Sequence, residues 1–287
     1  MHIGAAGIRS TVQDGGRLGH LRSGIPPAGP ADPAAFAAAC RLVGIDPSGG
    51  AIEIVGLPFS FSCADLRVVA VTGRDVRLRS RIRMPAWTAV LIRPGEEVVI
   101  EGAASTRYAY LAVSGGIALP AVLGSRSTYL PSALGPWPAA LRSSDELPLG
   151  GGRVPVERAG SRLAPPDYDA PVRAVPGPHA DRFASAVVDE LFAAPFAVSA
   201  ESDRMGARLV GRRIASGAGE ILTCGIVAGA IQIPRGGDPI VLLADHQTTG
   251  GYPIIATVVS ADLGLVAQRM PGEAVQLVRV TAAGERR

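Results

Sequence analysis

The chain runs from Pro239-Ile240-Val241-Leu242-Leu243-Ala244 through Asp245-His246-Gln247-Thr248-Thr249-Gly250-Gly251-Tyr252-Pro253 to Ile254-Ile255-Ala256-Thr257-Val258-Val259. The first and last runs are rich in strand-forming residues, whereas the middle run collects an acid, an imidazole, an amide, hydroxyls, glycines and a phenol. A plain turn in which the glycines supply positive φ is the alternative interpretation, but it needs far fewer polar side chains. Because loops held by strands concentrate binding and catalytic residues, the stretch predicts a functional loop within a β-rich fold.

Length and composition indicate a globular protein of one large domain or two ordinary ones. The 287 residues are 47% hydrophobic and 18% charged, which allows a substantial core. With 36 glycines and 24 prolines, the chain suits many short strands and tight turns better than a helical bundle. The net charge of +3, the lack of a basic run and the 5% of aromatic residues argue against nucleic-acid binding. Apolar runs are short and interrupted by glycine or proline, so no membrane span is expected.

All 28 basic residues of the chain are arginines, and the sequence contains no lysine. The chain therefore cannot supply a Schiff-base lysine, a P-loop lysine or a biotinylated lysine. Any cationic group in a binding site must be an arginine, whose planar guanidinium suits carboxylates and phosphates.

Cysteine and histidine spacing predicts neither disulfides nor a metal site. The three cysteines lie far apart, as expected for core residues of a protein in the reducing cytoplasm; they are Cys40, Cys63 and Cys224. No ligand spacing relates the four histidines, His2, His20, His179 and His246. The N-terminus has no basic region followed by an apolar stretch, so no signal peptide is evident.

Residues 1–150 are expected to form an N-terminal β-rich lobe that includes one helix. Asp32 as N-cap and Pro33 at the first helical position start this helix, which runs to about Val43 and stops at Gly44. The strands expected after it are Ala51–Val55, Pro58–Ser62, Leu66–Thr72, Val76–Leu78, Thr88–Ile92, Val98–Glu101 and Arg107–Val113. Such a series is typical of a β-barrel or a sandwich.

Residues 151–170 are expected to be a linker, because they are rich in glycine, proline, arginine and alanine and show no period. Residues 171–287 then form a C-terminal β-rich lobe. A helix from about Ala180 to Phe192 is expected near its start, and a closing strand over Ala274–Val280. A two-lobed protein of this kind is expected to hold its site between the lobes.

Two arginine-containing clusters are candidate binding loops. In Gly124-Ser125-Arg126-Ser127-Thr128 a guanidinium stands among three hydroxyls, which suits an anion or a carboxylate; a capping turn with a solvated arginine explains the stretch equally well. In Ser202-Asp203-Arg204-Met205-Gly206 a carboxylate, a hydroxyl and a guanidinium stand beside a glycine, although Asp203 and Arg204 can form a mere surface pair. Neither the first of these clusters nor Ser114-Gly115-Gly116 matches the elbow motif of serine hydrolases.

Gln232 interrupts an otherwise apolar strand, Ala230–Ile233. A buried glutamine needs hydrogen-bond partners. Its amide is therefore expected either to bind backbone groups or to face a binding site.

Over nearly its full length the sequence resembles the second of the subunits in the allophanate-hydrolase and urea-carboxylase carboxyltransferase group. Members of this group include the C subunit of bacterial 5-oxoprolinase and the antagonist of a sporulation-kinase inhibitor. Each matching stretch is weak alone, but their order along the chain makes the resemblance specific. The stretches are Thr11–Asp14, Gly16–Gly19, Ala51–Glu53, Leu111–Gly116, Gly124–Thr128, Pro176–Pro178, Ser202–Gly206, Gly229–Pro234 and Asp245–Pro253.

The resemblance implies a cyclophilin-like β-barrel architecture, mainly β with a few short helices, the two lobes together forming one carboxyltransferase-like domain. It also implies a smaller, similarly folded partner of the 5-oxoprolinase B type, together with an A-type protein of the same complex. For 5-oxoprolinase members the role is ATP-dependent opening of 5-oxo-L-proline to L-glutamate, with ATP handled through the complex. For urea-amidolyase members it is transfer of a carboxyl group from carboxybiotin to urea; biotin must then be carried by another protein, since this chain has no lysine.

A lactam-opening site needs a cation for the substrate carboxylate and groups that move protons. Arg126 or Arg204 suits the carboxylate, and Asp245 or His246 suits proton transfer. The expected catalytic residues are Asp245, His246 and Arg204. The expected substrate-binding residues are Arg126, Ser127, Thr128, Ser202, Asp203, Met205, Gly206, Gln232, Gln247, Thr248, Thr249, Gly250, Gly251 and Tyr252. The clusters 124–128, 202–206 and 245–253 are expected to converge on one small ligand.

Three functions remain open, in descending order of support from the sequence. The first is a subunit of a 5-oxoprolinase. The second is a carboxyltransferase component of a biotin-dependent enzyme that acts on urea or another small amide. The third is a non-catalytic protein that antagonises a kinase inhibitor by binding it.

Overall fold

A computed structural model describes residues 1–215, 219 and 221–281, and it divides the chain into two compact units. Unit 1 comprises Met1–Leu18 and Ala28–Asp167, and unit 2 comprises Gly19–Pro27 and Tyr168–Arg287. Both are mainly β, which confirms the expected fold class. In the described part of the chain the α-helices are α1 (Pro33–Val43), α2 (Ser185–Ala193) and α3 (Leu263–Ala267). Single turns of 3₁₀ helix occupy Leu21–Ser23, Pro47–Gly49, Leu130–Ser132, Val156–Arg158, Ala180–Arg182 and Ser260–Asp262.

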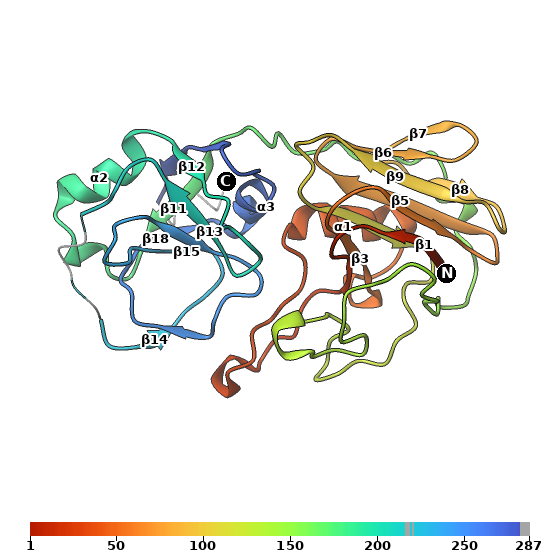
Figure 1. The fold of residues 1–287 in the computed structure, drawn as a ribbon, viewed down its shortest axis with the longest axis horizontal. Coiled ribbons are helices and arrows are strands. Elements are labelled where there is room, and N and C mark those ends of the chain that lie inside the picture. Colours follow the sequence, from red (N-terminus) through yellow and green to blue (C-terminus); the bar gives the residue numbers. More distant parts are fainter. Residues whose placement is uncertain (216–218, 220, 282–287) are drawn as a thin grey trace. The chain divides into compact units, whose positions relative to one another are not determined.

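Unit 1 contains two five-stranded antiparallel sheets (Figure 1). The first has the order β1 (His2–Ala6), β4 (Phe59–Ser62), β9 (Val98–Gly102), β6 (Val76–Arg79) and β7 (Arg83–Pro85). The second has the order β2 (Thr11–Gln13), β3 (Ala51–Ile54), β10 (Ala109–Val113), β5 (Arg67–Gly73) and β8 (Val90–Ile92). Alternate aliphatic and aromatic residues of both sheets, such as Phe59, Leu78 and Val71, join in one buried core.

Helix α1 begins and ends where the sequence predicts. The Asp32 carboxylate accepts the Ala35 N–H at 3.0 Å, Pro33 is the first helical residue, and Gly44 closes the helix in the left-handed conformation at φ 74°. The helix packs on β5 and β10. These signals are local, so the sequence suffices to predict this element.

Two chain segments group differently from their sequence assignment. Residues 151–167, expected as a linker, group with unit 1, and their backbone pairs with Ala89, the residue before β8: Ser161 accepts the Ala89 N–H at 2.9 Å and Gly160 donates to the Ala89 carbonyl at 2.8 Å. Residues 19–27, expected in the first lobe, group with unit 2. Composition alone does not reveal either assignment, because both depend on contacts distant in sequence.

Unit 2 is built on an eight-stranded sheet that is nearly a closed barrel. Its order is β19 (Ala274–Val275), β12 (Phe196–Val198), β13 (Gly206–Val210), β16 (Ile240–Leu242), β15 (Ala230–Gln232), β18 (Ile254–Val258), β11 (Val172–Pro176) and β20 (Leu277–Arg279). Only Gln276 separates the two edge strands β19 and β20 in the sequence, so the sheet comes back to its own start. A two-stranded ribbon of β14 (Cys224–Gly225) and β17 (Thr249–Gly250) accompanies it (Figure 1).

Two expected elements of unit 2 are interrupted. The expected helix from Ala180 to Phe192 is a 3₁₀ turn followed by α2, because Phe183 adopts an extended conformation and its side chain is buried. The expected strand over Ala274–Val280 is divided at Gln276, whose amide donates to the Phe192 carbonyl at 3.0 Å and the Leu277 carbonyl at 2.8 Å. In both cases a tertiary contact overrides the local preference.

Cysteine burial gives a testable reactivity pattern. Burial raises the pKa of the Cys40 thiol to about 12 and that of the Cys63 thiol to about 11, whereas Cys224 is partly exposed. Because the thiolate is the reactive form, we expect N-ethylmaleimide to modify Cys224 alone in the folded protein and all 3 cysteines in denaturant. Peptide mass spectrometry of the labelled chain checks this, and rapid labelling of Cys40 under native conditions contradicts the buried position of α1.

Candidate functional site

Three neighbouring strands of unit 2 present one continuous face. In the antiparallel register Gly206 of β13 lies opposite Leu242 of β16, and Arg208 lies opposite Ile240. Ile240 also lies opposite Gln232 of β15. Because side chains alternate along a strand, all five residues are on the same side of the sheet, and a Cβ added to Gly206 would lie only 3.0 Å from Ile240 Cγ2.

This face forms the floor of a cavity of about 280 Å³. The residues that line it all belong to unit 2: Glu201, Asp203, Met205, Gly206, Arg208, Gln232, Pro234, Ile240, Leu242, Gln247 and Tyr252. The volume suits a small ligand, since pockets for larger organic molecules are usually of several hundred Å³. Two expected clusters, 202–206 and 245–253, therefore contribute to one pocket.

The amide of Gln232 is the unusual group in this wall. Gln232 is only 1% exposed, and its buried Nε2 atom has no hydrogen-bond partner among the described residues. Nε2 lies against the backbone of Gly250, where a Cβ added to the glycine would be only 2.8 Å from Nε2. A buried amide without a partner lowers stability by about 1–3 kcal/mol, so a ligand that accepts its hydrogen bond would remove that penalty.

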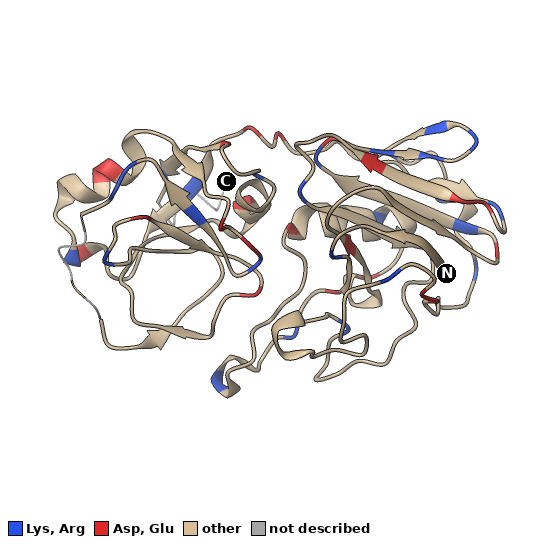
Figure 2. Ribbon diagram, viewed as in Figure 1, with Lys and Arg blue, Asp and Glu red and all other residues tan. Residues whose placement is uncertain are grey.

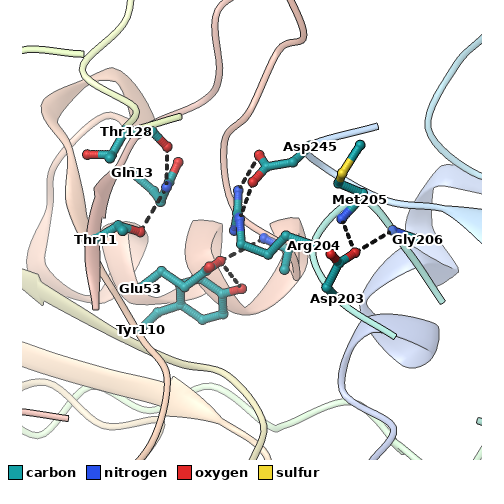
Figure 3. Close-up of polar contacts among 11 residues, drawn as sticks. Thr11, Gln13, Glu53, Tyr110, Thr128, Asp203, Arg204, Met205, Gly206 and Asp245 are labelled. Carbon is teal, nitrogen blue, oxygen red and sulfur yellow. Dashed lines mark hydrogen bonds and ion pairs between the residues drawn. The ribbon is translucent and has the colours of Figure 1, made fainter. Parts of the chain in front are cut away.

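The loop before β13 is held rigidly by its own polar groups. Asp203 Oδ1 accepts the N–H groups of Met205 at 2.8 Å and Gly206 at 3.3 Å (Figure 3). The Ser202 hydroxyl accepts the Arg208 N–H at 2.9 Å. Ser202 thus shapes the loop but is not among the lining residues, whereas Asp203 both shapes the loop and lines the cavity.

Arg204 and Asp245 form a buried ion pair that ties this loop to the chain after β16. Arg204 Nε and Nη2 donate to the two Asp245 carboxylate oxygens at 2.8 and 2.9 Å (Figure 3). The Asp245 N–H donates to the Arg204 carbonyl at 2.9 Å, and the Leu243 N–H to that of Met205 at 3.0 Å. Neither Arg204 nor Asp245 lines the cavity, so within unit 2 the pair supports the pocket wall.

His246, the third expected catalytic residue, is buried and does not line the cavity. Its Nδ1 lies 2.6 Å from the Gln247 carbonyl, so Nδ1 carries the proton in the neutral ring. Burial lowers the pKa of His246 below its ordinary value of 6.5, although the Gln247 carbonyl and the Asp245 charge oppose this change.

The lowered pKa of His246 predicts a pH dependence of stability. Between that pKa and 6.5 the unfolded chain binds more protons than the folded one, so the free energy of unfolding is expected to fall as pH drops below 6.5, by at most about 1.4 kcal/mol per pH unit. Urea denaturation across this range should show a shallower dependence for His246→Gln. His2→Gln is the control, because that side chain is half exposed; an unchanged slope in His246→Gln contradicts the assignment.

The rest of the polar loop has mixed positions. Gln247 and Tyr252 line the cavity. Thr249 and Gly250 form β17, Gly251 accepts the Ile221 N–H at 3.0 Å, and Thr248 accepts the Ile226 N–H at 3.1 Å. These backbone contacts hold the loop in place and orient the lining side chains.

The cluster 124–128 belongs to unit 1, where two of its hydroxyls donate hydrogen bonds to Asp14. Asp14 Oδ1 accepts the hydroxyls of Ser125 at 2.6 Å and Ser127 at 2.7 Å, and Oδ2 accepts the Arg126 N–H. The Arg126 guanidinium donates to the Leu119 and Ser48 carbonyls, both at 2.7 Å.

Thr128 is also used within unit 1. Its hydroxyl donates to the Trp137 carbonyl at 2.7 Å, and its own carbonyl accepts the Gln13 amide at 3.0 Å (Figure 3). Convergence of cluster 124–128 with the two clusters of unit 2 stays a prediction.

Some lining residues were not predicted from the sequence: Glu201, Arg208, Pro234, Ile240 and Leu242. Arg208 is the important one, since it places a guanidinium at the pocket, where its Nε lies 3.7 Å from Glu201 Oε2. Its position two residues after Gly206 in a strand was the available signal, because alternation puts both on one face.

Within residues 1–215, 219 and 221–281, no group of three or more histidine, cysteine, aspartate or glutamate side chains is placed to hold a metal ion. The same part of the chain contains no helix with the length and apolarity needed to cross a membrane.

The family of the chain follows from comparison with known proteins. The model of the family "Carboxyltransferase domain, subdomain A and B" matches residues 23–279. The chain belongs to this carboxyltransferase-domain family. Among curated members, the C subunit of 5-oxoprolinase from Escherichia coli is 35% identical over 279 residues, which cover 96% of this chain and 89% of the relative. Urea amidolyase of Saccharomyces cerevisiae is 29% identical over 317 residues, covering 100% of this chain but 17% of that enzyme.

Solved structures of the family share the fold. The crystal structure of TTHA0988 superposes with a TM-score of 0.87 at 29% identity. The match covers 96% of this chain and 55% of that chain, so this protein spans about half the length of its solved relative. The resemblance expected from the sequence motifs is therefore confirmed.

Proposed function

We propose that this chain is a subunit of a 5-oxoprolinase-type enzyme, which opens 5-oxo-L-proline to L-glutamate with ATP and partner subunits. The observation that carries the proposal is the small polar cavity of unit 2, which Gln232 and Arg208 line; the buried amide of Gln232 has no hydrogen-bond partner among the described residues. 5-Oxoproline is a small lactam with a carboxylate, so it offers both a carbonyl acceptor and an anion. The identity of 35% with the C subunit of 5-oxoprolinase supports the same assignment.

The lining residues divide between the two ends of such a substrate. Gln232 donates an N–H to the lactam carbonyl, which removes the penalty of its unpaired amide. The guanidinium of Arg208 binds the carboxylate. Hydrolysis breaks the lactam C–N bond, adding the hydroxyl of water to the carbonyl carbon and a proton to the nitrogen. Proton transfer by Asp245 or His246 stays a prediction, which the variants Asp245→Asn and His246→Gln test in the same assay.

ATP does not fit this cavity. Glu201 and Asp203 oppose a single arginine, Arg208, among its charged lining residues in the described chain, and a triphosphate requires an excess of cations. We therefore assign ATP to the other subunits of the complex, which we propose to be a smaller protein of the 5-oxoprolinase B type and a protein of the A type. The proposed location is the cytoplasm, where the thiols stay reduced.

The experiment is reconstitution of the chain with candidate partner subunits encoded beside it. We expect L-glutamate to form from 5-oxo-L-proline only when ATP and all subunits are present. Omission of this chain should abolish the product. A complete complex that binds together but forms no glutamate contradicts the proposal.

A second candidate is carboxyl transfer from carboxybiotin to urea or a similar amide. The full coverage of this chain by the urea amidolyase match favours it, and a urea carbonyl would also accept the Gln232 N–H. Biotin would have to be carried by another protein, since the chain has no lysine. Carboxylation of urea by the chain together with carboxybiotin, without glutamate formation from 5-oxoproline, would decide for this candidate.

A further inference from the structure

Unit 1 has an open groove where its two sheets end. Strands β7 and β8 are terminal strands of the first and second sheet, and no strand of the described chain pairs with their outer edges (Figure 1). A groove of about 580 Å³ lies along them, lined by residues of the β7 hairpin, of β8 and of the segment 159–162. All of its described lining residues belong to unit 1, whereas those of the other pocket belong to unit 2.

The backbone of β8 is prepared to accept another strand. The N–H of Ala89 donates to the Ser161 carbonyl, and the carbonyl of Ala89 accepts the Gly160 N–H. Two residues on, the groups of Leu91 point to the same side, because backbone direction alternates along an antiparallel ladder. Val68 of β5 lies opposite Leu91, but it does not bond to Leu91: its N–H donates to the Ser114 hydroxyl, and its carbonyl accepts the Ser114 N–H. In the described chain the N–H and carbonyl of Leu91 form no hydrogen bond on the outer side of β8. They therefore extend the line of outward-facing backbone groups that begins at Ala89.

The groove is apolar at its base and exposes large hydrophobic side chains at its rim. Met84, Ala89 and Val90 line it. Ile82 is 71% exposed and Leu91 is 40% exposed. An open strand edge beside such side chains favours association with another strand.

The charges around the groove are mostly positive. Among its described lining residues are four arginines, Arg81, Arg83, Arg93 and Arg162, and within the described chain none of them forms an ion pair within 4.0 Å. The acidic lining residue Glu96 is occupied, since it accepts the Ser80 hydroxyl at 2.6 Å and the Arg93 N–H at 2.9 Å. The Ser80 hydrogen bond, with smaller contributions from Arg93 and Arg81, lowers its pKa. Figure 2 shows the basic residues gathered on the β7 hairpin.

We propose that this groove docks an extended acidic segment of a partner protein, which pairs with the outer edge of β8. Main-chain hydrogen bonds to Leu91 would give the segment its direction. Alternate apolar side chains on one face of the segment would cover Ile82 and Leu91, and its carboxylates would meet the arginines of the rim. A small anion would leave the apolar base and the strand edge uncovered, so a peptide chain fits the groove better.

The probe is a fluorescein-labelled octapeptide of alternating glutamate and valine, and binding to the full chain is measured by fluorescence anisotropy. We expect saturable binding that weakens at least tenfold in the double variant Arg81→Glu/Arg83→Glu. The matched control is Arg9→Glu/Arg142→Glu, which reverses two exposed arginines elsewhere in unit 1 and should leave binding unchanged. The same peptide N-methylated at every backbone amide should also bind at least tenfold more weakly, because neither of its edges can then donate a hydrogen bond to β8.

Several outcomes overturn the proposal. Equal binding of the N-methylated peptide excludes strand pairing, and equal binding of an alternating arginine and valine peptide excludes charge recognition. Abolition of peptide binding by millimolar phosphate at constant ionic strength identifies a small-anion site instead. No binding of the acidic peptide also contradicts docking. None of these measurements depends on the pocket of unit 2, so a failure here leaves the proposed function untouched.

Discussion

Replacing Arg204 with alanine is expected to lower the free energy of unfolding by about 3–5 kcal/mol, because it leaves a buried carboxylate without its cation. Arg204 is 9% exposed and Asp245 is 4% exposed, and two hydrogen bonds join them at 2.8 and 2.9 Å. Urea denaturation followed by circular dichroism measures the change. Since the pair ties the loop before β13 to the chain after β16, the pocket wall should loosen as well.

Two controls distinguish the effect of burial on stability from the effect of the ion pair itself. Arg79→Ala breaks a pair of similar length, 3.0 Å to Glu101, whose partners are about half exposed, and is expected to change stability by at most about 1 kcal/mol. The double variant Arg204→Met/Asp245→Leu removes both charges and is expected to be more stable than either single replacement. If Arg204→Ala and Arg79→Ala prove equally mild, the buried pair does not stabilise unit 2 as described.

Replacing Gln232 with methionine is expected to lower turnover of the reconstituted complex by on the order of 100-fold, because the carbonyl of the substrate loses a hydrogen-bond donor. The same change should leave stability unaltered or raise it by about 1 kcal/mol, because a buried amide without a partner is replaced by an apolar group of similar length. Glutamate formation and urea denaturation measure the two effects. Opposite changes in activity and stability distinguish a ligand-binding residue from a structural one.

A matched variant for Gln232 is Gln13→Met in unit 1. Gln13 is also fully buried, but its amide donates to Thr11 Oγ1 at 2.9 Å and to the Thr128 carbonyl at 3.0 Å. We therefore expect Gln13→Met to lower stability. A Gln232→Met protein that is destabilised like Gln13→Met shows that the amide has a structural partner.

How far the sequence predicts this protein depends on the range of each interaction. The ends of α1 follow from Asp32, Pro33 and Gly44, since capping involves neighbouring residues. The loop 245–253 does lie between strands β16 and β18, because alternation and glycine content are local signals as well. Gln232 was recognisable as an amide that must bind or face a site.

Long-range contacts explain what the sequence did not reveal. From the sequence, the hydroxyls of Ser125 and Ser127 were interpreted as part of a ligand-binding loop. In the structure both donate to the carboxylate of Asp14, which is more than a hundred residues away in the sequence. The sequence analysis did not single out Arg208, and the register with Ile240 is what puts it at the pocket. Patterns of residue type do not specify such pairings.

The most direct test of the pocket is a crystal structure of the chain, with its partner subunits, soaked in 5-oxo-L-proline. The ligand is expected in the cavity of unit 2, with its lactam oxygen within hydrogen-bond distance of the Gln232 amide and its carboxylate at Arg208. A well-occupied ligand elsewhere in the complex, with this cavity holding only water, would contradict it.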